Sequence, residues 1–301
     1  MKKTNITLAA GLMLLAASHY APACAADLEN TSVTWFAKSR QLTEAELRDL
    51  LRDPAPEVRK AAVRASRRYI LANGTSELVI AVLKNAGERA DIRVEAARVL
   101  SYPRSNSRAQ DALQDVIRFG DQPGELRVMA YKALWDAAGV NSRCQDFLVA
   151  AVRREERDAA ARRAAIWALW GSVTDPGPRE MLKDLLKYGD EDEETKAETI
   201  KSLYRALPGS DVKDLVFDIA RDRSGSQPKA VRLPAILALA AVSHDQRVRD
   251  VLEEIAERSS DQDLRLAAIE ALSQDMRRIQ EYFHLGFRTQ NQGFISPIET
   301  E

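Results

Sequence analysis

A short pattern recurs seven times along the chain at an almost constant interval. In each copy a basic residue, usually preceded by an apolar one, opens an alanine-rich apolar run. The basic residues are Arg59, Arg93, Arg127, Arg162, Lys196, Arg232 and Arg265. Successive copies are 34, 34, 35, 34, 36 and 33 residues apart. A period of this length is typical of stacked helical pairs, whereas a single globular core imposes no such regularity.

The helical wheel divides each copy into an inward and an outward side. Counted from the basic residue as zero, positions minus one, plus three, plus four and plus seven share one arc. The plus-three column is almost entirely alanine: Ala62, Ala96, Ala130, Ala165, Thr199, Ala235 and Ala268. Small side chains let helices approach closely, so this column predicts the crossing point between neighbouring repeats. Plus four, from Val63 to Ile269, and plus seven, which is Leu in six copies, predict the core.

A second amphipathic segment precedes each copy, as in Leu182, Leu185 and Leu186 of the fifth. Clusters of Gly, Pro, Asn and Asp separate the segments, and no run alternates long enough to indicate a sheet. We therefore predict an all-α fold, an α-solenoid of about seven two-helix repeats over residues 42–286. A last helix is expected over residues 275–285.

This repeat resembles HEAT repeats, in particular the bacterial HEAT-like class, over residues 42–285. That family has an acidic residue in the turn between the two helices and a basic one at the start of the second. Here an acidic residue stands six positions before the basic one in four copies, as Asp53, Asp121, Glu156 and Asp190. The other copies have Gly87, Ser226 and Ser259 there. The resemblance implies that these charged side chains bridge adjacent repeats and are structural.

The N-terminus has the pattern of a targeting segment. Lys2 and Lys3 precede an apolar run over residues 6–17, and Ala23-Cys24-Ala25 fits a small-x-small cleavage site. A run of about a dozen apolar residues is too short for a membrane-spanning helix. We predict a signal peptide over residues 1–26 and a location in the periplasm or outside the cell. The alternative is a lipid anchor at Cys24, although Ala21 stands where a lipobox usually has Leu.

The chain ends are predicted to lie outside the repeats. Residues 27–41 include Trp35 and Phe36 and are expected to cover the first repeat as an N-terminal cap segment. Residues 287–301 lack a helical period and are predicted to form a flexible C-terminal tail.

The sequence offers few groups for catalysis. The two histidines beyond the leader, His244 and His284, are far apart, and metal-binding spacings, a phosphate loop and a G-x-S-x-G elbow are absent. The acidic run at residues 190–194 lacks the spaced ligands of a calcium loop and precedes a helix N-terminus, where negative charge is stabilising. We therefore predict no enzymatic activity, no cofactor and no metal.

The resemblance leaves a lyase alternative, because some HEAT-like proteins are phycobilin lyases. Those enzymes act inside the cell, whereas this chain has an export signal. A formal net charge of -1 also gives no general excess of basic residues for binding nucleic acid.

The plus-five column is the candidate binding surface, because it lies opposite the core of each second helix. The candidate binding residues are Arg64, Arg98, Lys132, Trp167 and Lys201; Leu237 and Glu270 complete the column. Second helices line the concave face of a helical solenoid, so this column predicts a protein partner with an acidic or anionic segment. Two alternatives stay open. Basic residues are ordinary on helix surfaces, and Trp167 and Trp170 could instead close an irregular junction beside Gly171.

These features predict a non-enzymatic periplasmic scaffold, adaptor or inhibitor that binds another protein. The alternative is a structural element of the envelope, anchored by a lipid at Cys24, whose solenoid spaces other components.

The export prediction is open to a direct measurement. Intact-mass spectrometry of the exported protein should give a chain that begins at Ala26 or Asp27. A mass that retains residues 1–20, or one that carries an acyl group on Cys24, would contradict cleavage by an ordinary signal peptidase.

Overall fold

The structure is a computed structural model of the chain. It describes residues 42–102, 105–119, 122–188, 190–274, 279, 282–283, 288–289 and 293–294. The predicted signal peptide and the predicted cap segment lie outside these residues, as do most of the expected last helix and of the predicted tail. The chain forms two compact units, Met1–Pro103 and Arg104–Glu301.

The N-terminal unit contains two helix pairs. They are α3 (Glu44–Leu50) with α4 (Pro56–Ser66), and α5 (Asn73–Lys84) with α6 (Ala90–Val99). A capping box starts α3, because the Thr43 side chain accepts from the Glu46 amide while the Glu46 carboxylate accepts from the Thr43 amide. Pro56 occupies the first turn of α4, where the missing amide hydrogen costs nothing.

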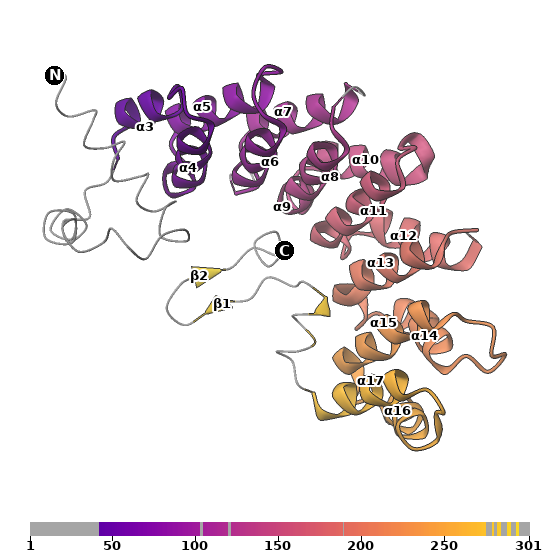
Figure 1. Cartoon of the computed structure of the whole chain (residues 1–301). Helices are drawn as coiled ribbons and strands as arrows, with labels where there is room; N and C mark the ends of the chain where they lie inside the picture. The colour runs from indigo at the N-terminus through magenta and orange to yellow at the C-terminus, as the bar shows by residue number, and fades with distance from the viewer. Residues whose placement is uncertain are drawn as a thin grey trace, which may run out of the picture. The chain divides into compact units, whose positions relative to one another are not determined.

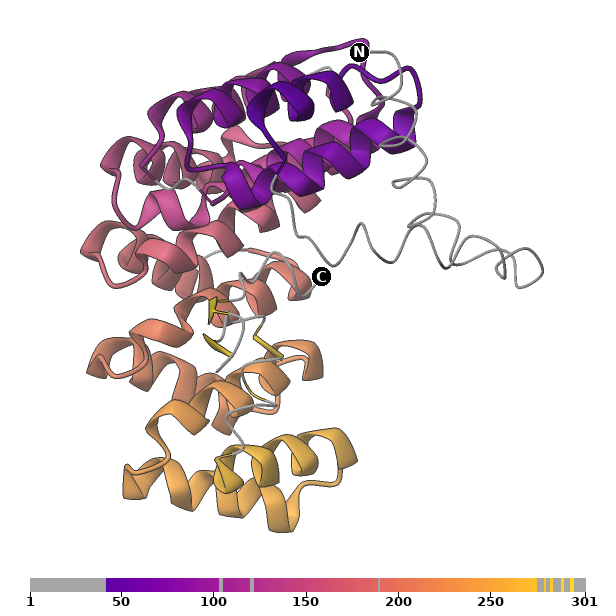
Figure 2. The ribbon, with the colours of Figure 1, turned by 90° about the vertical axis from the view of Figure 1, so that its left-hand side faces the viewer.

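The C-terminal unit contains five further pairs (Figure 1). They are α7 (Ser107–Arg118) with α8 (Gly124–Ala133), α10 (Ser142–Ala150) with α11 (Ala159–Ala168), α12 (Pro176–Tyr188) with α13 (Glu193–Leu203), α14 (Ser210–Arg221) with α15 (Lys229–Ala238), and α16 (Gln246–Arg258) with α17 (Gln262–Ser273). A short helix α9 (Trp135–Ala138) follows α8, and 3-10 turns at Leu169–Ser172, Tyr204–Ala206 and Leu239–Val242 follow later second helices. Within this unit the second helices pack side by side in one layer and the first helices form another (Figure 2).

The described strands are one short antiparallel ladder, β1 (Arg288–Thr289) with β2 (Gly293–Phe294). In the part of the chain that the structure describes, no helix is both long and apolar enough to span a membrane. The predicted all-α fold with two helices per repeat is confirmed.

The burial of the repeat columns follows the wheel in almost every copy. All seven plus-three residues are at most 1% exposed. The plus-four residues from Val63 to Ile236 are also buried, but Ile269 is 49% exposed, so the core prediction is wrong at this position. The reason is its place in the stack, because no further helix pair follows α17 among the described residues to cover it.

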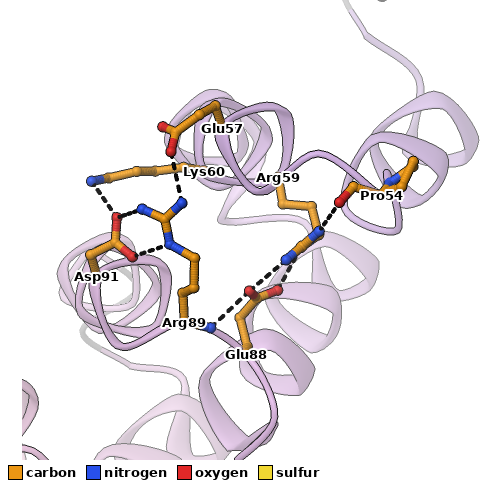
Figure 3. Close-up of polar contacts among 7 residues, drawn as sticks. All are labelled: Pro54, Glu57, Arg59, Lys60, Glu88, Arg89 and Asp91. Carbon is orange, nitrogen blue, oxygen red and sulfur yellow. Dashed lines mark hydrogen bonds and ion pairs between the residues drawn. The ribbon is translucent and has the colours of Figure 1, made fainter.

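The repeated arginines bridge adjacent repeats, as the resemblance implied. Arg59 donates from Nε and Nη2 to the Glu88 carboxylate of the next pair at 2.7 and 2.8 Å (Figure 3). Arg162 makes a forked contact with Glu191 as well, and donates from Nη1 and Nη2 at 2.6 and 2.8 Å. Arg127 donates to Glu156, which also accepts from the Tyr131 hydroxyl.

The acidic partners differ in part from the expected ones. Only Glu156 is an acceptor at the predicted position, six residues before the next basic residue, whereas Glu88 and Glu191 stand five before it. Asp53 contacts Arg59 through its backbone carbonyl, while its carboxylate accepts from the Ala55 amide and so shapes the turn. The prediction that Asp53 and Asp190 supply the bridging carboxylates is therefore wrong for these bridges.

The same arginines also bind within their own helix pair. Arg93, Arg162, Arg232 and Arg265 donate from Nε to backbone carbonyls of Leu83, Val152, Ala220 and Ala256. These carbonyls lie at or near the C-terminal end of the first helix, where the carbonyls lack a helical partner and the dipole is negative. Arg162 makes both kinds of contact and so connects its own helix pair with the next one.

Candidate binding surface

The plus-five residues of the N-terminal unit share one acidic partner. Arg64 lies 3.4 Å from Glu95 Oε1 and its side chain is 62% exposed. Arg98 lies 3.9 Å from Glu95 Oε2 and is less exposed. Glu95 therefore offsets part of the positive charge that the sequence predicted for this face.

In the C-terminal unit the plus-five cations lie over aromatic rings. The Lys132 ammonium is 5.6 Å from the centre of the Trp167 ring, and the Lys201 ammonium is 5.1 Å from the centre of the Tyr282 ring. Lys201 also lies 3.9 Å from Glu198. A cation at these distances is attracted by the negative face of the ring.

Trp167 is not the exposed anchor that the sequence predicted, because the residue is only 7% exposed. Its ring packs edge-on against Trp135 with 6.5 Å between ring centres, and Lys132 covers it. The expectation of an indole facing solvent is wrong because side chains of the preceding repeat fill the space beside it.

Gly171 explains how the two repeats come so close. A methyl group at Gly171 would lie 1.8 Å from the Trp135 carbonyl oxygen, so only glycine allows this contact between backbones. Gly139 lies at the same contact, where an added methyl would be 2.8 Å from the Gly171 oxygen. Trp167 therefore has the junction role that the sequence left open.

An aromatic series at position plus eight was missed by sequence reasoning. Trp135, Trp170 and Tyr204 occupy it in the third, fourth and fifth copies. The ring centres of Trp135 and Trp170 are 5.2 Å apart, and the Arg205 guanidinium lies 4.9 Å from the centre of the Trp170 ring. The signal was present in the sequence, because three aromatic residues recur at one position of the repeat.

Two residues near the C-terminus complete the cluster. Phe283 stacks on Tyr204 with ring centres 4.6 Å apart, and Tyr282 meets Phe283 edge-on at 5.2 Å. Loss of solvent raises the pKa of Tyr282 to about 12, so the phenol is neutral at physiological pH. Sequence reasoning had no repeat position for these residues and so did not connect them with Lys201.

We call this set the aromatic surface and define it by seven residues on the second-helix layer. They are Trp135, Trp167, Trp170 and Tyr204 with the cations Lys132, Lys201 and Arg205. The structure thus brings Lys132, Trp167 and Lys201 of the predicted column together. Arg64 and Arg98 belong to the N-terminal unit.

The first-helix layer has a separate open groove of about 510 Å³. Leu186, Leu215 and Ile219 line it, together with Arg221, Arg223 and Arg247.

Among the residues that the structure describes, no His, Cys, Asp or Glu side chains are grouped to hold a metal ion. Cys144 is fully buried, and burial raises the pKa of its thiol.

Comparisons with known proteins support the repeat class. A family model described as HEAT repeats matches residues 180–273, which confirms the resemblance over the last three helix pairs. The solved structure of YibA from Escherichia coli is 18% identical, with 90% of this chain and 94% of that chain covered and a TM-score of 0.49. Human deoxyhypusine hydroxylase, solved in complex with glycerol, is 14% identical, with 78% and 84% covered and a TM-score of 0.36. A search of curated proteins found no match. Likeness at this level carries no argument about activity.

The two tryptophans should differ in their effect on stability. Trp167→Ala removes a buried ring from the junction and should lower the free energy of unfolding by about 3–5 kcal/mol. Trp170→Ala removes a half-buried ring and should cost less than half as much. Urea unfolding followed by circular dichroism measures both, and an equal or smaller loss for Trp167→Ala would contradict its assignment to the core.

Proposed function

We propose that this chain is an exported, non-enzymatic adaptor that binds another protein on the aromatic surface of its C-terminal unit. One observation carries this proposal: Lys132 of the third repeat and Arg205 of the fifth each lie over a tryptophan ring of the fourth repeat. Arginine and tryptophan are the residues most often found as energetic anchors of interfaces.

The charges of this surface favour an acidic or anionic segment of the partner. Arg205, in the 3-10 turn after α13, is exposed. Lys201, in the last turn of α13, is partly exposed. Contacts of such partly exposed charges contribute under about 1 kcal/mol each and weaken with salt. Trp170 is therefore the aromatic anchor that a partner can reach, because Trp135, Trp167 and Tyr204 are at most 8% exposed.

The repeat architecture supports binding as the main activity. Stacked helical pairs present an extended surface built from equivalent positions of successive repeats. Arg64 and Arg98 occupy the same repeat position in the N-terminal unit, where they are a separate proposed contact site. The targeting pattern predicted at the N-terminus, Lys2 and Lys3 before an apolar run, favours a partner in the periplasm.

Charge reversal on matched faces tests the proposal. The protein is used to capture partners from an envelope extract, and the affinity of the captured protein is then measured in solution. Lys201→Glu with Arg205→Glu should weaken binding at least about tenfold, because two attractive contacts become repulsive.

The control reverses two exposed cations on first helices, Lys187→Glu with Arg258→Glu. It should change the affinity less than about threefold. Equal affinities for both double variants, with unchanged melting temperatures, would place the binding surface elsewhere.

A further inference from the structure

The aromatic surface holds two side chains that do not belong to the repeats. Phe283 lies against Tyr204, and the Tyr282 ring lies 5.1 Å below the Lys201 ammonium. Ile279 and Phe283 are almost fully buried, although they follow the last helix pair in sequence. The described residues Tyr282 and Phe283, in the segment that follows α17 in sequence, therefore contact the fifth helix pair.

The fit of this segment leaves polar groups of the surface unsatisfied. Trp170 Nε1, Ser202 Oγ and the Tyr204 hydroxyl are buried without a hydrogen-bond partner among the described residues. An indole Nε1 can only donate, so it requires an acceptor from the molecule that covers it. A buried donor without an acceptor loses its hydration and gains nothing in return.

A small cavity remains at the same place. Trp170, Lys201, Ser202 and Phe283 are among the residues that line it, and its volume of about 10 Å³ is at the lower limit for one water molecule. The segment therefore makes close ring contacts with the surface but leaves the surrounding polar atoms without hydrogen bonds.

We propose that the aromatic surface recognises a partner segment with two adjacent aromatic side chains and a neighbouring carboxylate, and that Tyr282 and Phe283 occupy this site within the chain as a pseudo-ligand. The inference rests on the proposed function and specifies the partner and the regulation of the same surface. The aromatic pair follows from the two ring contacts that the chain's own segment makes.

The carboxylate follows from what that segment leaves unused. A partner carboxylate can accept from Trp170 Nε1 and pair with Arg205, which lies over the same ring. A partner that satisfies these groups gains contacts that the internal segment lacks. The internal segment and the partner cannot occupy the site at the same time. The apparent affinity for the partner is therefore its intrinsic affinity multiplied by the fraction of molecules in which the site is open.

A peptide supplied in trans tests the proposal. The probe is a labelled peptide with the sequence of residues 276–287, and the receptor is the full chain with Tyr282→Ala and Phe283→Ala. Fluorescence anisotropy should show that the peptide binds this variant at least about tenfold more tightly than it binds the unmodified chain, because its site is open. The same peptide with alanine at both aromatic positions should not bind.

Further substitutions in the opened variant locate the site. Adding Lys201→Glu and Arg205→Glu should abolish peptide binding, whereas adding Lys187→Glu and Arg258→Glu should not. If the opened variant fails to fold, Tyr282→Ala alone replaces it, because this side chain is only half-buried.

Three results would overturn the inference. The first is that the peptide does not bind a folded, opened variant. The second is that it binds the opened and the unmodified chains equally, and the third is that binding survives the Lys201 and Arg205 reversals.

The two proposals can fail separately. A captured partner that depends on Lys201 and Arg205 but does not compete with the peptide contradicts this inference and leaves the adaptor function standing. A peptide that binds as expected, with captured partners indifferent to those reversals, contradicts the adaptor function instead.

Discussion

Neighbouring second helices lie against each other because the residue at their crossing point is small. In the C-terminal unit this position is Ala130, Ala165 or Thr199 on α8, α11 and α13, and each is fully buried. Close approach of these helices places positions plus five and plus eight of one repeat beside those of the next. The 5.2 Å separation of the Trp135 and Trp170 rings is a consequence. The aromatic surface thus depends on alanines that do not form part of it.

Charged bridges align the repeats that the alanines bring together. A buried ion pair adds little net stability compared with apolar packing, but breaking one partner is costly because the other charge stays buried. We therefore assign the Arg59–Glu88, Arg127–Glu156 and Arg162–Glu191 pairs to alignment. First helices are bridged as well, by Lys183–Asp211 at 2.7 Å and Lys213–Asp245 at 2.6 Å.

The sequence predicted what a single helix determines and missed what depends on neighbouring repeats. Burial at plus three follows from periodicity, so the wheel predicted it in all seven copies. The exposure of Trp167 was predicted wrongly because a helical wheel gives the direction of a side chain but not whether neighbouring side chains cover it. Here Trp135 and Lys132 of the preceding repeat do so. The bridging Glu88 and Glu191 were missed by one residue because the backbone of each turn decides which carboxylate reaches the arginine. Tyr282 could not be placed, since no local pattern links it to α13.

A partner bound on the second-helix layer of the C-terminal unit should shield that layer from solvent, and hydroxyl-radical footprinting of the complex tests this without any substitution. Trp170 reports on the second-helix layer, and Tyr188, which is 82% exposed at the end of α12, reports on the first-helix layer. We expect a bound partner to slow the oxidation of Trp170 and to leave the oxidation of Tyr188 unchanged. Protection of Tyr188 with unchanged oxidation of Trp170 would contradict it.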